Sequence, residues 1–371
     1  MANTIICGMD AHDNTLSNRI GVNRGTPETK TVKNTQDGRQ KLFKYLRALA
    51  QKNEGAKIIV AYEASPIGFG IYDECVEVGI ECHILAPTKM PKAVKDRKRK
   101  YDERDAQRIF ELLRAHVLAG NDLPDIWIPD HQTRDDREMV RSRVDAGKKL
   151  TALKTQVQML LKRNKAVKPK DVGIAWTKTH RRWIEELEMK KGARIALASF
   201  LRQIASLEEE SKILDKEIER LSKTDRYRLP AEALIVQIKG VGLLTAMVYL
   251  TEIGDMRRFN NRKKIGSYLG LVPSSNESGE CNDRKGHITR EGPARVRKVL
   301  CQATWVRVAH DEEEAGVYQR IVKKNPKHKK IAVVASMRRL GVLMWHIAWD
   351  AQVKAGVFKD DSIEVASFQT A

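Results

Sequence analysis

The first 120 residues alternate short runs of β-branched and apolar residues with segments of helical periodicity. Runs of the first kind predict strands, whereas apolar residues recurring every three or four positions predict helices. Strands are therefore predicted at 4–9, 19–22, 30–33, 57–63 and 80–86, and helices at 38–50, 68–78 and 102–117. An antiparallel start followed by strand–helix–strand units predicts a mixed sheet with helices on its faces.

Beyond residue 120 the pattern changes to long helices. A connector bracketed by Pro124 and Pro129 is followed by a predicted helix at 134–163 and, after a break at 169–173, by a second long helix. The second helix carries a heptad seam formed by Phe200, Ile204, Leu207, Ser211, Leu214, Ile218 and Leu221. This seam fits an intramolecular helical hairpin or an intermolecular coiled coil, and the spacing alone does not decide between them.

The chain becomes helical and basic from Pro230 onward. Gly240 and Gly242 form a G-x-G turn before an apolar helix, a pattern typical of a helix-hairpin-helix, whose glycines let backbone N–H groups approach a DNA phosphate. A loop is predicted at 273–291 and a last helix at 330–353. The predicted organisation is an α/β domain of ribonuclease-H-like shape at 1–123, a helical region at 130–228, a C-terminal domain at 229–358 and a tail at 359–371.

Charge narrows the class of partner. The 371 residues include 68 Lys and Arg against 48 Asp and Glu, a formal charge of +20. Mean hydropathy is −0.48, and the longest apolar runs are shorter than the ~20 residues that span a membrane. The N-terminus has no charged leader, and the five cysteines form no C-x-x-C pair, which argues against secretion and a zinc finger. We therefore expect a cytosolic protein with a polyanionic partner and no membrane contact.

Basic side chains are concentrated in two segments. Six of the nine residues at 92–100 are Lys or Arg, and residues 257–298 hold eleven Lys and Arg against four acids. Such segments fit a phosphate-binding track, and a solvated surface loop is the alternative. The candidate nucleic-acid contacts are Lys95, Arg97, Lys98, Arg99, Lys100, Lys239, Gly240, Gly242, Arg284, Lys285, Arg290 and Arg295.

Four carboxylates form the strongest candidate for chemistry. Asp10 ends the first predicted strand and Glu63 ends the strand 57–63, so adjacent strands would bring both to one sheet edge. Asp102 and Asp105 stand three residues apart at the start of a helix, hence on one face. Hard oxygen ligands of this kind suit one or two Mg²⁺ ions in a phosphoryl-transfer site. The alternative is structural, because Asp also favours turns and helix caps.

The residues around these carboxylates resemble a known family. Gly8-Met9-Asp10-Ala11-His12, Tyr62-Glu63-Ala64-Ser65 and the segment 100–106 resemble, in this order, the DEDD transposases of insertion sequences, a group that includes the Piv and MooV DNA invertases. Further segments follow in the family's order: Gly240–Gly242, Phe259, Tyr268–Pro273, Glu277–Gly279, Arg284–Gly286 and Arg295–Leu300. The resemblance covers nearly the whole chain and is weakest over the helical middle.

The resemblance implies a RuvC-like N-terminal domain, a coiled-coil linker and a mainly helical C-terminal transposase domain. It implies that Asp10, Glu63, Asp102 and Asp105 bind Mg²⁺ and that Ser278 attacks DNA to form a covalent phosphoserine link. Some family members are recombinases guided by a structured non-coding RNA that pairs with donor and target DNA. The family pattern also implies a site shared between protomers of a homodimer or tetramer, acting at the nucleoid in the prokaryotic cytoplasm.

Departures from the family pattern keep alternatives open. Relatives commonly have further serines after Ser278, where this chain has Glu280 and Cys281, and a Lys where this chain has Asp13. Ser275 therefore competes with Ser278 as the nucleophile, and Cys281 is a weaker competitor because only His287 lies nearby. Two other functions also fit the sequence: a metal-dependent junction nuclease that uses water, and a non-catalytic nucleic-acid scaffold.

Overall fold

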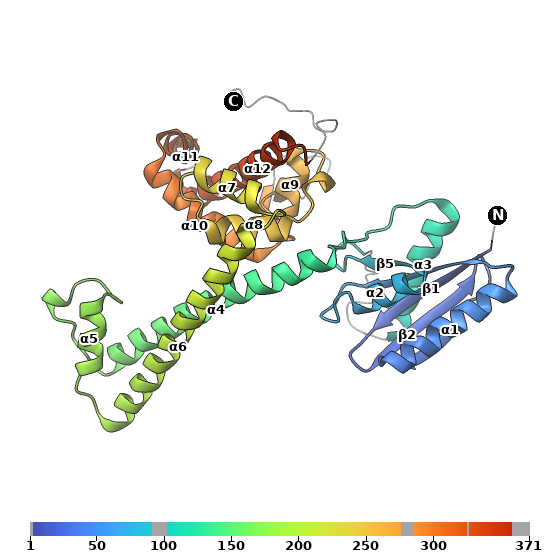
Figure 1. Cartoon of the computed structure of the whole chain (residues 1–371), viewed down its shortest axis with the longest axis horizontal. Helices are drawn as coiled ribbons and strands as arrows, with labels where there is room; N and C mark the ends of the chain where they lie inside the picture. The colour runs from blue at the N-terminus through green and yellow to red at the C-terminus, as the bar shows by residue number, and fades with distance from the viewer. Residues whose placement is uncertain (1–2, 91–101, 276–284, 325, 358–371) are drawn as a thin grey trace. The chain divides into compact units, whose positions relative to one another are not determined.

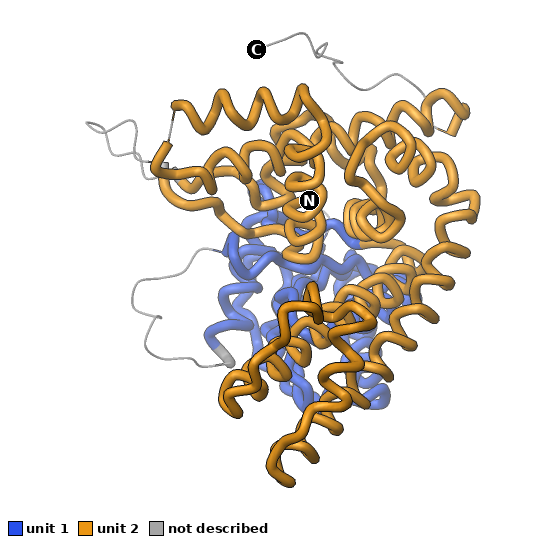
Figure 2. Tube along the Cα trace, turned by 90° about the vertical axis from the view of Figure 1, so that its left-hand side faces the viewer, with its two compact units in different colours: residues 1–128 blue, residues 129–371 orange. Residues whose placement is uncertain are grey.

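The computed structural model describes residues 3–90, 102–275, 285–324 and 326–357, except the side chains of residues 102, 103, 275 and 285. Two compact units make up the chain, residues 1–128 and residues 129–371 (Figure 2). The backbone of residues 124–126 pairs with the edge of the sheet in the first unit, through hydrogen bonds from Ala86 to Pro124 and from Ile126 to Ile84. The connector thus belongs to the first unit up to Ile128.

The first unit is built on a five-stranded mixed sheet. Its strands are β1 (Thr4–Ala11), β2 (Thr15–Val22), β3 (Glu28–Lys33), β4 (Lys57–Glu63) and β5 (Glu81–Leu85). The strand order is β3-β2-β1-β4-β5, with β1 antiparallel to β2 and parallel to β4. This confirms the predicted mixed sheet with an antiparallel start. The predicted second strand is longer than expected, because it begins at Thr15 rather than Arg19.

Helices cover both faces of this sheet (Figure 1). They are α1 (Gln36–Lys52), α2 (Gly70–Glu77) and α3 (Asp102–Ala119). On one face, Cys7 and Met9 of β1 belong to a core shared with α1 and α2. On the other face, Ile6 of β1 and Ile59 of β4 pack with α3. The alternation along β1 therefore separates two cores, as the period of two in a strand requires.

Within its described residues, the second unit is helical apart from one short β-hairpin. Its α-helices are α4 (His131–Arg163), α5 (Lys178–Glu186), α6 (Lys191–Ser222), α7 (Arg228–Gln237), α8 (Leu243–Ile253), α9 (Arg262–Tyr268), α10 (Ala294–His310), α11 (Glu312–Lys324) and α12 (Lys329–Lys354); the short 3₁₀ helices are η2 (Lys170–Val172), η3 (Met256–Arg258) and η4 (Pro326–His328). Helices α4 and α6 pack along each other as a hairpin, with α5 at its far end (Figure 1). Ile204, Ser211 and Ile218 of the seam are buried within the chain. The seam thus has an intramolecular partner, and the structure gives no support for an intermolecular coiled coil.

Helices α7 to α12 surround the largest hydrophobic core of the second unit. Within the described residues, one helical stretch, Pro326–Lys354, is long and apolar enough to cross a membrane by length and composition. Leu340 and Trp345 of this stretch are fully buried against the other helices. The core position explains the apolar composition of α12.

Two C-terminal predictions meet different outcomes. The G-x-G pattern does separate two helices, because α7 and α8 flank the turn at 238–242. The predicted loop at 273–291 is wrong at 273–275 and 285–288, where β6 (Pro273–Ser275) and β7 (Lys285–Ile288) pair antiparallel. These strands have three and four residues and no apolar alternation, so the local pattern holds no signal for them.

Candidate active site

Sheet geometry brings Asp10 and Glu63 together. Strands β1 and β4 are parallel neighbours, and their last paired residues are Met9 and Tyr62. Asp10 and Glu63 are the next residue on each strand, so they lie side by side at the carboxyl ends of adjacent strands. Because side chains alternate across a strand, both share the sheet face of Ile6 and Ile59, which α3 covers.

An open cavity of about 620 Å³ lies at this point. Asp10 and Glu63 both line it, together with the turn after β1 and the segment that follows β4. Asp10 is mostly buried and Glu63 is half-buried, so two acidic groups face a space large enough for a phosphate and its surrounding atoms.

Glycine at position 8 allows α3 to lie directly on β1. A Cβ at Gly8 would stand 2.3 Å from the backbone nitrogen of Phe110 and 2.7 Å from the backbone oxygen of Ala106. The first turns of α3 thus pack against the strand two residues before Asp10. Helix α3 begins at Asp102, four residues before Ala106, and its first turn also carries Asp105.

The four predicted metal ligands are described to different extents. Asp105 is paired with Arg108, whose Nη1 lies 3.4 Å from its Oδ1, and it is not among the cavity-lining residues. The side chain of Asp102 lies outside the described residues. Among the described residues, no three His, Cys, Asp or Glu side chains gather closely enough to hold a metal ion. Two carboxylates at a polar cavity nevertheless suit Mg²⁺, which proteins often bind through one or two carboxylates together with substrate phosphates.

His12 is a neighbour that sequence reasoning missed. Its Nε2 lies 3.1 Å from Oδ2 of Asp10, and its backbone oxygen accepts a hydrogen bond from the Asn34 side chain. The sequence does hold a signal, because His12 stands only two residues after Asp10, just beyond the end of β1 at Ala11. The histidines of the chain lack metal-ligand spacing, which favours surface positions and hides this contact from a search for metal motifs.

The predicted nucleophile lies in a segment whose two ends are described. Ser278 lies outside the described residues, as do Arg284 and the predicted basic track from Lys95 to Lys100. Ser275 ends β6 and Lys285 begins β7, so these two paired strands flank the segment that contains Ser278. The side chains of Ser275 and Lys285 are not described.

A tight backbone crossing holds the base of this hairpin. A Cβ at Gly292 would stand 1.8 Å from the backbone oxygen of Tyr268, and a Cβ at Gly270 would stand 2.8 Å from the backbone nitrogen of Glu291. Arg290, another predicted nucleic-acid contact, is exposed and has a φ of 57°. Its backbone nitrogen donates to the Gly270 oxygen, so the crossing holds this residue in a conformation that non-glycine residues rarely adopt.

Helix α4 supports the same region through a buried polar cluster. Arg137 donates from Nε to the Thr251 oxygen and from Nη2 to the Glu252 oxygen, at 2.7 and 2.8 Å. These carbonyls belong to the last turn of α8, so Arg137 caps that helix, and its burial lowers its pKa. Arg141 forms two hydrogen bonds with the Glu252 carboxylate, and Tyr268 donates to the Glu252 oxygen. No local pattern predicts contacts between residues more than 100 positions apart.

Among the remaining nucleic-acid candidates, Gly240, Lys239 and Arg295 contact other parts of the protein, whereas Gly242 does not crowd a neighbour. Gly240 has a φ of 84°, and a Cβ there would stand 2.9 Å from the Ala303 oxygen, so packing on α10 already requires glycine. Gly242 precedes α8 with open space around it, and Lys239 Nζ lies 3.5 Å from the His310 oxygen. Arg295 Nη2 donates to Asp145 Oδ2 at 2.7 Å and thereby connects α10 to α4.

Comparison with known protein families gives two matches. Residues 7–165 match the DEDD transposase family, described as a transposase, and residues 232–319 match the family described as Transposase IS116/IS110/IS902. The first match includes all four candidate carboxylates, and the second includes the glycine turn and both candidate serines.

Individual relatives carry related names. The chain is 30% identical over 249 residues to a candidate transposase, y4qE, of Sinorhizobium fredii, an alignment that covers 67% of this chain and 58% of that relative. It is 24% identical over 311 residues to the transposase for insertion sequence element IS1533 of Leptospira borgpetersenii, covering 82% and 86%. A pilin gene-inverting protein of Moraxella bovis is 32% identical over 111 residues, covering 29% and 34%.

Proposed function

Because the chain belongs to the IS116/IS110/IS902 family of transposases, we propose that it cuts and rejoins DNA strands as the recombinase of a mobile element. The observation that carries this proposal is the pair Asp10 and Glu63, which line one cavity at the ends of adjacent parallel strands. The net charge of +20 supports a polyanionic substrate.

The carboxylates would hold a divalent metal, Mg²⁺ in this proposal. Asp10 and Glu63 supply two hard oxygen ligands, and Asp102 and Asp105 at the start of α3 would supply others. When bound, the ion would offset negative charge on the reacting phosphate and on the attacking and leaving oxygens. The hydrogen bond between His12 and Asp10 would hold that carboxylate in one orientation.

The Ser278 hydroxyl would be the attacking group. Its oxygen forms a bond to phosphorus as the bond from phosphorus to one sugar oxygen breaks, and the serine proton is given up while the leaving oxygen gains one. The DNA end is then held as a phosphoserine ester, and attack by a sugar hydroxyl from another strand reverses the step and releases the serine. Ser275, at the base of the same hairpin, is the alternative nucleophile.

The proposed partners are nucleic acids and further copies of this chain. We propose double-stranded DNA as donor and target, a structured RNA of the element as guide, and a homodimer or tetramer that joins the carboxylates of one protomer to the serine of another. The protein would act in the cytoplasm at the nucleoid. The family match and the basic composition support these partners.

The test combines a metal-site variant with adduct mapping. Asp10→Ala and Glu63→Ala should abolish strand cleavage while folding and nucleic-acid binding persist, because removing one carboxylate from a like-charge group relieves repulsion. Glu77→Ala, which removes an exposed carboxylate at the end of α2, is the matched control and should cleave normally. In the wild type, a covalent protein–DNA adduct should survive denaturant and map to the peptide that contains Ser278, and Ser278→Ala should bind DNA without forming it.

Each other outcome identifies a different function. An adduct on Ser275 would keep the mechanism and move the nucleophile. Metal-dependent cleavage by Ser278→Ala, with no adduct in the wild type, would identify the junction-type nuclease that uses water. Cleavage at the wild-type rate by Asp10→Ala and Glu63→Ala would overturn the metal site, and binding without any cleavage would leave the non-catalytic scaffold.

A further inference from the structure

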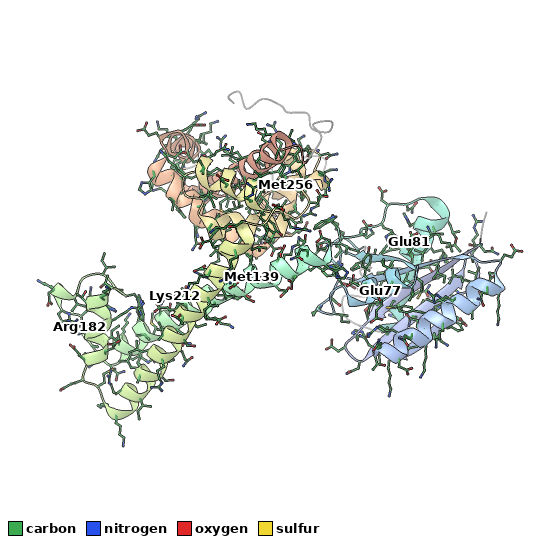
Figure 3. All side chains as sticks on the ribbon, in the orientation of Figure 1. Glu77, Glu81, Met139, Arg182, Lys212 and Met256 are labelled. Atoms are coloured by element: carbon green, nitrogen blue, oxygen red, sulfur yellow. The ribbon has the colours of Figure 1, made fainter. Side chains whose placement is uncertain are left out.

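The far end of the α4–α6 hairpin concentrates positive charge that the proposed site does not use. Residues 162–194, here called the hairpin tip, contain eleven Lys and Arg against four Asp and Glu, a net charge of +7. Nine of these cations are exposed and form no ion pair among the described residues: Lys162, Arg163, Lys165, Lys168, Lys170, Lys178, Arg182, Lys190 and Lys191. Figure 3 shows Arg182 at this end of the hairpin, with Lys212 farther along α6.

The tip is a built structure rather than a loose connection. Helix–helix connections usually take 2–8 residues, whereas 27 residues separate α4 from α6 here. Glu208 of α6 accepts two hydrogen bonds from Arg181 of α5, at 2.8 and 2.6 Å, and an ion pair at 3.1 Å from Lys154 of α4. Val157, Ile184 and Leu197 form a small core beneath them. Exposed cations therefore stand on a rigid frame, which lowers the entropy cost of binding.

The cations also occupy positions at the starts of helices, where positive charge is unfavourable. Helices favour acidic residues in the first turn, yet α5 begins at Lys178 and α6 at Lys191, and neither has an acid in its first turn. A segment that served only to connect two helices would gain stability from acids at these positions. The arrangement instead leaves positive charge at both helix starts, with no neutralising acid in the described first turns.

From these observations we propose that the hairpin tip binds the phosphodiester backbone of double-helical nucleic acid, as a contact separate from the cavity at Asp10. The inference rests on the proposed function, which supplies the nucleic-acid partner. The tip has no described cluster of exposed aromatic side chains for base stacking, because Trp176 and Trp183 are half-buried against His180. Binding is therefore expected to be independent of sequence and strongly dependent on salt.

The experiment compares two triple variants of the full chain that remove the same charge. Lys170→Gln, Lys178→Gln and Arg182→Gln together change the tip, whereas Lys212→Gln, Lys216→Gln and Lys223→Gln change exposed positions along the same hairpin. Binding is measured against salt concentration with two probes, a random-sequence DNA duplex and an RNA hairpin, and each variant is checked for wild-type circular dichroism and oligomeric state.

The tip variant should bind more weakly to either or both probes, and its plot of log affinity against log salt should be shallower by up to ~0.9 for each duplex phosphate that the protein no longer neutralises. The probe that binds more weakly identifies DNA or RNA as the source of the phosphates. Equal affinity and slope for wild type and tip variant, or an equal loss in the control variant, would overturn the proposal. A changed oligomeric state with unchanged binding would assign the tip to a protein contact instead. A wild-type protein that binds neither probe would overturn the proposed function itself.

Discussion

The two parts of the proposed site are held by different kinds of structure. In the first unit, Asp10 and Glu63 stand on regular parallel strands, and the pairing of β1 with β4 fixes their relation. In the second unit, strands of three and four residues flank the predicted serine segment along the chain, and a backbone crossing at Gly270 and Gly292 lies beside them. The comparison indicates that Asp10 and Glu63 are placed by strand register, whereas β6 and β7 depend on a few close backbone contacts.

The largest losses of stability should come from adding a side chain at the two glycines whose Cα positions lie against backbone atoms, Gly8 and Gly292. Gly8→Ala would drive a methyl group into the α3 backbone, and Gly292→Ala would drive one into the Tyr268 carbonyl. Because neither neighbour is a flexible side chain, we expect destabilisation of exceptional size, above about 4 kcal/mol. Hydrogen exchange read by mass spectrometry should show reduced protection within 1–128 for Gly8→Ala and within 129–371 for Gly292→Ala.

Matched glycines in the same units provide the controls. A Cβ at Gly70 or at Gly316 meets nothing within 4 Å, and neither residue has a positive φ. Gly70→Ala and Gly316→Ala should therefore be neutral or stabilising by up to ~1 kcal/mol. If Gly8→Ala were as mild as Gly70→Ala, α3 would not lie directly on β1, and the proposal that Asp102 and Asp105 supply further metal ligands would lose its support.

The difference between the two units also explains what the sequence could predict. The strands β1 and β4 follow from local patterns, because runs of apolar and β-branched residues predict them. The end of β4 at Glu63 is as predicted, whereas β1 runs past the predicted end at residue 9 to Ala11, where Asp10 and Ala11 still pair with β2. The seam of α6 was likewise predicted from a local pattern, its heptad spacing, whereas its partner helix α4 was not. The family resemblance, rather than any pattern, singled out Ser278.

The contacts that hold the region around β6 and β7, here called the serine hairpin, could not be predicted from the sequence. Arg137 and Arg141 reach Glu252 across more than 100 residues, and a lone Arg on a long helix is usually interpreted as solvated. The strands β6 and β7 are too short to show alternation, and the role of Gly240 in packing against Ala303 depends on a tertiary contact. Long-range polar contacts of this kind have no local periodicity to detect.

A smaller effect is expected where α4 supports α8. Arg137→Met retains the bulk of the side chain but removes the Arg137 donors, so the Thr251 carbonyl loses its side-chain hydrogen bond and the Glu252 carbonyl keeps the one from Tyr268. Loss of one partner from a buried charged cluster should lower the free energy of unfolding by roughly 3 kcal/mol. Chemical denaturation of Arg137→Met measures this. Lys149→Met, an exposed position on the same helix, is the control and should differ from wild type by less than about 0.5 kcal/mol.

The outcome bears on how the serine hairpin is positioned. Arg137→Met should reduce formation of the covalent adduct more than it reduces cleavage-independent DNA binding, because α8 and Tyr268 lie beside the hairpin base. Stability equal to that of Lys149→Met would mean that the hairpin region does not depend on α4. The backbone crossing at Gly270 and Gly292 would then be the remaining described contact that distinguishes this region from the strand-based placement of Asp10 and Glu63.

The smallest effect concerns Arg295 and Asp145, which connect α10 to α4 at the surface. The hydrogen bond from Arg295 is the main reason that the pKa of Asp145 lies below its ordinary value. A lowered carboxyl pKa stabilises the fold above the ordinary value, near ~3.9, and this contribution is lost as pH falls through the lowered pKa. Because both side chains are more than one-third exposed, a double-mutant cycle of Arg295→Gln and Asp145→Asn should give a coupling below about 1 kcal/mol at pH 7 that shrinks below about pH 4.

The same variants separate a structural role of Arg295 from its predicted contact with nucleic acid. A structural tie alone predicts equal, small losses of stability in Arg295→Gln and Asp145→Asn, with no change in how DNA affinity depends on salt. A phosphate contact predicts a shallower salt slope in Arg295→Gln only, because Asp145→Asn keeps the cation and removes its competitor. We expect the stability coupling in either case, since the pair is present at 2.7 Å. A coupling of zero at neutral pH would show that the second unit gains no stability from this surface contact between α10 and α4.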